Sequence, residues 1–81
     1  MMNTSLPKNY DAIAVGKAAE AKSAAGDLES AQLVYQSALM EWQDDALGFG
    51  PTHPQWEQLR HSIASLWLSY AHFNRKMKQA S

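Results

Sequence analysis

Apolar residues in the last third of this 81-residue chain recur at alternating spacings of three and four. The seven positions are Trp56, Leu59, Ile63, Leu66, Tyr70, Phe73 and Met77. An α-helix places residues at these spacings on one face, so the pattern predicts a long helix that buries a single stripe. We expect this helix to cover residues 54–78, with a basic C-terminal end that complements the negative end of the helix dipole.

The length of the chain limits it to one domain with one core. A domain of this size buries only about 60% of the surface of its unfolded chain, so its core has to be efficient. The hydrophobic fraction of 46%, with 10% aromatic residues, is typical of a globular protein. The sequence has no cysteine, which excludes disulfides and thiolate chemistry. We therefore expect a cytoplasmic protein that is held together by packing alone.

A first helix is expected over residues 10–25. Asn9 is a good N-cap, and Asp11 would then lie in the first turn, where the helix dipole favours a negative charge. The segment is rich in alanine, which lets neighbouring helices approach closely but contributes little buried area. Larger side chains near its start are expected to supply the bulk: Tyr10, Ile13 and Val15.

Gly26 and Asp27 predict the turn that follows. Glycine can take the left-handed conformation that ends one helix, and aspartate can cap the next. So short a connection makes the two helices antiparallel. The second helix is expected over residues 28–47, and its inward stripe is Leu28, Ala31, Tyr35, Ala38 and Trp42, widened by Leu39 and Ala46. Asp44 and Asp45 near its C-terminal end indicate either a partner for their charge or a frayed last turn.

The segment Gly48 to Pro51 breaks the second helix. Thr52 followed three residues later by Gln55 is the pattern of a capping box, which restarts the chain with Pro54 early in the next helix. Trp42 and Trp56 flank this loop and are expected to close that end of the molecule with Phe49. The prediction is an all-α, three-helix, up-down-up antiparallel bundle, with helices over 10–25, 28–47 and 54–78, the third being longest, and a tail over 1–9 before a domain over 10–79.

The hairpin resembles the turn of a tetratricopeptide repeat. The residues that carry this resemblance are Ala24 to Ala31, followed by Tyr35, Ala38 and Leu39. No second copy follows, so a solenoid is not expected. The same hairpin followed by one longer helix resembles the MIT (microtubule-interacting and transport) domain, a three-helix bundle of similar length. That resemblance implies binding of short peptide motifs in grooves beside the third helix.

Acid–base and nucleophilic chemistry find little support in the sequence. Asp44 and Asp45 are adjacent on a helix and point in different directions, which does not suit carboxylates that share a proton. His53 could meet Asp44 or Asp45 across the loop, but we assign it a local structural role there rather than a role as a metal ligand. Ser65 and Ser69 have no histidine–acid arrangement around them. We expect no enzyme activity and no cofactor.

Metal, nucleic-acid and membrane binding are also not expected. His61 and His72 lie about three helical turns, ~16 Å, apart, too far to share a metal ion. A net charge of −1 does not suit electrostatic binding of nucleic acid. The basic cluster near the C-terminus, Arg75, Lys76 and Lys78, is interpreted as a solubilising helix end. The apolar-rich run over residues 62–73 is well short of the ~20 residues that cross a bilayer.

A second, narrower apolar edge lies beside the main stripe of the third helix. Ala64, Trp67 and Ala71 follow the three–four spacing, with Leu68 adjacent. Either Trp67 fills the space against the alanine-rich first helix, or it faces a partner. A tryptophan flanked by alanines makes a shallow groove with one anchor. The predicted partner-binding residues are Ala64, Trp67, Leu68 and Ala71, with Leu33 and Met40 of the second helix.

Two functional readings follow. The first is a non-catalytic protein–protein interaction module, an adaptor or regulator, that binds a partner segment beside the third helix. The alternative is a self-associating small regulatory or inhibitory protein, of phage or plasmid type, that docks onto a larger machine as a homodimer. An enzyme would require an oligomeric site gathered around His53, Asp44 and Asp45.

Overall fold

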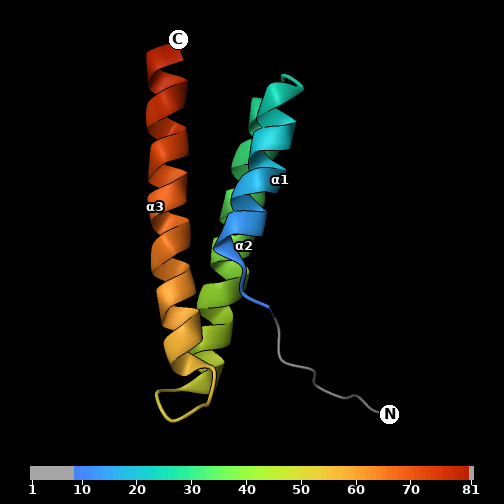
Figure 1. The fold of residues 1–81 in the computed structure, drawn as a ribbon. Coiled ribbons are helices and arrows are strands. Elements are labelled where there is room, and N and C mark those ends of the chain that lie inside the picture. Colours follow the sequence, from blue (N-terminus) through green and yellow to red (C-terminus); the bar gives the residue numbers. More distant parts are fainter. Residues whose placement is uncertain (1–8, 81) are drawn as a thin grey trace, which may run out of the picture.

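The computed structural model describes residues 9–80, the side chains of residues 79 and 80 excepted; apart from Asn9, the predicted tail lies outside the described residues. The helices are α1 (Ala12–Ala24), α2 (Leu28–Phe49) and α3 (Trp56–Ala80). Each helix runs antiparallel to the one before it (Figure 1). The predicted all-α, three-helix, up-down-up bundle with the third helix longest is confirmed.

The start of α1 differs from the prediction. Asp11 is the N-cap, and its carboxylate accepts a hydrogen bond from the backbone N–H of Ala14 at 3.1 Å. The predictions that Asn9 caps the helix and that Asp11 lies in the first turn are therefore wrong. Asn9 instead accepts a hydrogen bond through its backbone carbonyl from the N–H of Asp11, at 2.9 Å. Of the two candidate caps, the one nearer the alanine-rich run reaches the free N–H groups of the first turn.

The turn between α1 and α2 forms as predicted. Gly26 has a φ of 88°, and its N–H donates to the carbonyl of Ser23 at 2.9 Å. Asp27 caps α2 by accepting a hydrogen bond from the backbone N–H of Ser30 at 3.1 Å. Hydrogen bonds from the Ser30 side chain and backbone hold the pKa of Asp27 below its usual value of 3.8. The glycine and the aspartate therefore have the two roles that the sequence assigns to them.

The C-terminal end of α2 is ordered beyond its two aspartates. The helix continues to Phe49, two residues past the predicted end, and Gly50 follows with a φ of 76°. The hydroxyl of Tyr10 donates to Oδ2 of Asp45 at 2.9 Å. The carboxylate of Asp45 is therefore held by a residue that precedes α1, and the last turn of α2 is helical.

His53 organises the loop between α2 and α3. Its Nδ1 accepts a hydrogen bond from the backbone N–H of Gln55 at 3.0 Å, and its ring stacks on Phe49 with centroids 3.8 Å apart. The predicted structural role of His53 is confirmed. The predicted capping box is wrong, because α3 begins at Trp56, four residues after Thr52, and the predicted first turn from Pro54 belongs to the loop.

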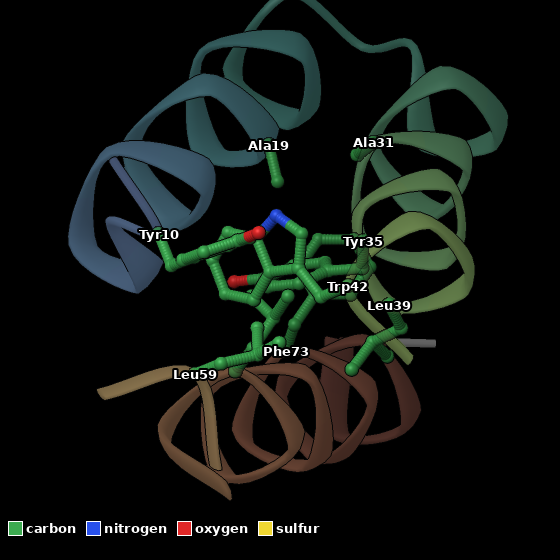
Figure 2. Packing of buried hydrophobic residues seen from close by; sticks show 9 residues of the cluster. Tyr10, Ala19, Ala31, Tyr35, Leu39, Trp42, Leu59 and Phe73 are labelled. Atoms are coloured by element: carbon green, nitrogen blue, oxygen red, sulfur yellow. The ribbon is translucent and has the colours of Figure 1, made fainter. Parts of the chain in front are cut away.

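The core lies between the three helices. Its buried apolar side chains are Tyr10, Ala19, Ala31, Tyr35, Leu39, Trp42, Leu59, Leu66 and Phe73. Figure 2 shows them pointing into the space that the helices enclose. The predicted stripe of α3 is confirmed, since Leu59 and Leu66 are 0% exposed and its remaining members are buried or half-buried.

Two residues predicted to face inward are exposed instead. Ile13 keeps 72% of its surface exposed and Leu28 keeps 46%. The inward side of α1 is built from smaller residues at three–four spacing: Ala12, Val15, Gly16, Ala19 and Ser23. Ile13 lies one position off that face. Leu28 lies in the first turn of α2, at the end of the molecule where α3 diverges from the other two helices (Figure 1).

Candidate interaction surface

The predicted partner-binding side chains are all exposed. Their positions are Leu33 and Met40 on α2, and Ala64, Trp67, Leu68 and Ala71 on α3. Exposure ranges from 49% at Trp67 to 72% at Met40 among the large members. The alternative in which Trp67 fills the space against α1 is therefore wrong. A tryptophan that leaves half of its surface in water is uncommon in a small domain, because large aromatics contribute most when buried.

One contact between α2 and α3, together with helical spacing, indicates that these residues share one side of the molecule. The ring of Trp67 lies 6.3 Å from that of Tyr70, and the Tyr70 hydroxyl accepts a hydrogen bond from Nε2 of Gln36 at 2.9 Å. Trp67 is thus on the side of α3 that adjoins α2. Leu33 and Met40 lie three residues before and four residues after Gln36, on the same side of α2. We call the surface formed by Leu33, Met40, Ala64, Trp67, Leu68 and Ala71 the α2–α3 face.

The sequence reasoning missed one further apolar residue beside this face. Leu47 is 86% exposed, the highest value among the exposed large hydrophobic residues. It follows Met40 by seven residues and Leu33 by fourteen, so the three lie along one line of α2. That heptad spacing was available in the sequence, but the inward stripe of the same helix is the stronger pattern.

The two helices of the face carry opposite charge. Along α2 there are four carboxylates and no lysine or arginine; the acids are Glu29, Glu41, Asp44 and Asp45. Along α3 there are four basic residues and one acid; the bases are Arg60, Arg75, Lys76 and Lys78, and the acid is Glu57. Arg60 and Glu57 form an exposed ion pair at 3.1 Å. The face therefore joins an acidic helix to a basic one.

One shallow hollow lies between α2 and α3, and another lies on α2. At the open end, where α2 starts and α3 finishes, a wide groove of about 710 Å³ is lined by residues that include Gln32, Ala71 and Arg75. Toward the C-terminal end of α2, residues of this helix alone, among them Met40, Asp44 and Leu47, line a depression of about 520 Å³. Basic side chains border the first hollow and acidic side chains border the second.

A third hollow lies between α1 and α3. It measures about 600 Å³ and is lined by residues that include Glu20, Tyr35, Phe73 and Lys76. On its floor the Tyr35 hydroxyl lies 2.8 Å from Oγ of Ser69. Ser69 is therefore engaged with a tyrosine rather than with a histidine that could activate it. Among the described residues, every buried side-chain nitrogen and oxygen atom has a hydrogen-bond partner.

The other candidates for chemistry are not brought together. His61 has its Nε2 3.7 Å from the Glu57 carboxylate, in an exposed pair one turn apart on α3. Within the part of the chain that the structure describes, no three histidine, aspartate or glutamate side chains form a group that could hold a metal ion. No helix in residues 9–80 combines the length and the apolar character needed to cross a membrane.

Comparisons with known protein families, with curated proteins and with solved structures give no match to this chain. The resemblance to the MIT domain and to the tetratricopeptide hairpin therefore stays a prediction. What the protein does is inferred from its fold and from the surface described above.

Proposed function

We propose that the protein is a non-catalytic protein-interaction module, and that it binds a helical segment of a partner protein on the α2–α3 face. The observation that carries this proposal is the exposure of Trp67 in the middle of a surface with Leu33, Met40 and Leu68, each at least 49% exposed. Several large apolar side chains exposed on one side of a small domain are typical of interaction sites, since each Å² left in water forgoes ~25 cal/mol.

The shape of the face suits a helix as the bound element. Trp67 is a large anchor, and Ala64 and Ala71 lie about one turn to either side of it. Small residues beside an anchor leave room for the side chains of a partner helix, which recur at three–four spacing. Leu33 and Met40 of α2 lie across the same surface from these α3 residues. The partner expected from this arrangement is an amphipathic helix with apolar residues along one stripe.

A display library of amphipathic helical peptides, selected against the full chain, tests the proposal. Selected peptides should bind the wild-type protein and lose at least tenfold in affinity for the Met40→Lys variant, because the new charge lies within the apolar face. Ile13→Lys is the matched control, since Ile13 and Met40 are both 72% exposed and Ile13 lies on α1. Failure to select any helix, or equal loss in both variants, would contradict the proposal.

Self-association is the second candidate function, and the opposite charges of α2 and α3 favour it. A surface with one acidic and one basic half is complementary to a rotated copy of itself. A small regulatory protein of this kind would act as a homodimer. The geometry of that dimer is developed next.

A further inference from the structure

We propose that the α2–α3 face is covered by a second copy of this chain, in a two-fold dimer in which α2 of each copy packs against α3 of the other. This inference rests on the proposed function, because it names the partner of the same face. The four helices of the two faces would then form a bundle in which every neighbouring pair is antiparallel and joins an acidic helix to a basic one.

Charge selects this arrangement over the other two-fold packing of the same face. A two-fold axis across the helices would place α2 against α2, and thus Glu29 and Asp44 against the carboxylates of the second α2, and would also pair the two basic helices. Like charges brought together at an interface cost several kcal/mol. An axis parallel to the helices places α2 on α3 instead, so opposite charges meet at the two ends of the interface.

The heights of the charged residues along the helices fit this axis. The hydrogen bond between Gln36 and Tyr70 fixes those two residues at the same height. Counting ~1.5 Å per residue away from them in the two antiparallel helices puts Glu29 within ~3 Å of the height of Arg75. The same count puts Asp44 within ~3 Å of the height of Arg60.

An axis parallel to the helices leaves all heights unchanged. Glu29 of one copy would therefore face Arg75 of the second copy at one end. At the other end, Asp44 would face Arg60 of the second copy, which also pairs with Glu57 of its own chain. Glu29 precedes Leu33 by four residues, and Arg75 follows Ala71 by four, so both lie on the same side as the face. Neither Glu29 nor Arg75 forms an ion pair within the described residues.

The apolar centre of the face fits the same packing. Met40 and Trp67 lie at heights that differ by ~1.5 Å. Met40 of one copy would therefore contact Trp67 of the second copy, and Trp67 of the first copy would contact Met40 of the second. Ala64 and Ala71 provide space on either side of Trp67 for Met40 and Leu33 of the second copy. With α3 ~37 Å long and each of the two helices ~10 Å wide, the whole outer side of α2 and α3, polar residues included, covers roughly 700 Å², close to the ~800 Å² per partner of a stable interface.

Sedimentation equilibrium of the full chain over a wide concentration range tests the dimer, with circular dichroism to check that each variant folds. The wild-type protein should have twice the mass of one chain. Met40→Lys should raise the dissociation constant at least tenfold, and Ile13→Lys, equally exposed on α1, should leave it unchanged. A wild-type protein that stays monomeric at millimolar concentration would overturn the inference.

A charge exchange tests the orientation of the dimer. Glu29→Lys and Arg75→Glu, each alone, should weaken dimerisation at least tenfold, because each creates two like-charge contacts between copies. An equimolar mixture of the two variants should form a heterodimer with nearly wild-type affinity, since both contacts between copies are then oppositely charged. Within each variant chain the altered residue and its like-charged neighbour on the adjacent helix are unchanged by mixing. Any recovery of affinity in the mixture can therefore come only from contacts between copies.

The outcomes separate this inference from the proposed function. A mixture that stays monomeric would overturn the orientation. A monomeric wild-type protein that still selects helical peptides in a Met40-dependent manner would overturn the dimer and leave the proposed function standing. Dissociation by Ile13→Lys as strong as that by Met40→Lys would count against both, because the α2–α3 face would then not be the surface in use.

Discussion

The hydroxyl oxygens of Tyr35 and Ser69 lie 2.8 Å apart and join α2 to α3 inside the bundle. Tyr35 is 2% exposed, and its ring also stacks on Tyr70 with centroids 5.1 Å apart. Gly16 of α1 approaches this pair so closely that a Cβ atom there would lie 3.2 Å from Oγ of Ser69. All three helices therefore meet at one polar point in an otherwise apolar core.

Replacement of Tyr35 by phenylalanine should cost about 1 kcal/mol of unfolding free energy, because it leaves the Ser69 hydroxyl without its partner in a partly buried position. Urea denaturation measures this loss. Tyr70→Phe is the matched control, since its hydroxyl bond to Gln36 is exposed and should change stability by less than about 0.5 kcal/mol. Equal losses in the two variants would mean that the Tyr35–Ser69 pair does not stabilise the core.

The close approach of Gly16 can be tested by a double-mutant cycle. Gly16→Ala should gain up to about 1 kcal/mol from helix propensity, but in the wild-type background the new methyl group crowds Oγ of Ser69. In a Ser69→Ala background that crowding is absent, so the full gain should appear. Thermal unfolding of the four proteins gives the coupling. Identical gains in both backgrounds would contradict the contact between α1 and α3 at this point.

Leu66 is 0% exposed, and its replacement by alanine should cost roughly 2 to 5 kcal/mol through lost burial and a residual cavity. In a domain of this size that is much of the total stability. Ile13→Ala provides the contrast, because Ile13 is 72% exposed and its loss should stay within about 0.5 kcal/mol. Denaturation at one fixed protein concentration compares the two. A small effect at Leu66 would show that the stripe of α3 is not the core.

The lowered pKa of Asp27 predicts how the N-cap of α2 responds to acid. Since the folded state holds the pKa below its usual value of 3.8, the ionised cap stabilises the folded protein above that pH. This stabilisation is lost as the pH falls through the lowered folded value. Asn caps helices about as well as Asp but does not titrate here. The melting temperature of the wild type, relative to Asp27→Asn, should therefore fall only below about pH 4.

If the difference between wild type and Asp27→Asn stayed constant from neutral pH to about pH 2, the hydrogen bonds to Ser30 would not depend on the charge of Asp27. The comparison cancels the other carboxylates, because both proteins contain them. The readout is the difference between two melting temperatures at each pH rather than the curve of either protein.

The sequence predicts α3 and the turn at Gly26 and Asp27 well because each rests on a strong local pattern. α3 repeats its apolar spacing over three heptads, and glycine followed by aspartate leaves few alternatives. The start of α1 was misplaced because Asn9 and Asp11 are both good caps. The residue whose side chain reaches the first free N–H groups becomes the cap. The identity of the two residues alone does not show which one that is.

The sequence predicts which residues form the candidate surface, but it leaves open whether Trp67 is exposed. Periodicity places Trp67 beside the buried stripe, yet whether a neighbouring helix covers it depends on the distance between helices. That distance is set in part by Gly16 and Ala19, whose small size lets α1 lie close to its neighbours. The prediction for Ile13 is wrong because the inward side of α1 follows the three–four spacing of its small residues, and Ile13 lies one position off that side.

The small residues on the inner side of α1 also decide how this bundle can change over time. Ala19 is 0% exposed, and every replacement other than glycine is larger and would push the helices apart. Leu59 and Leu66 on α3, also fully buried, leave space in the core when they are replaced by valine or alanine. We therefore expect sequence changes in this core to be coupled. A larger residue on the inner side of α1 should be tolerated when an opposing residue of α3 becomes smaller by the same volume.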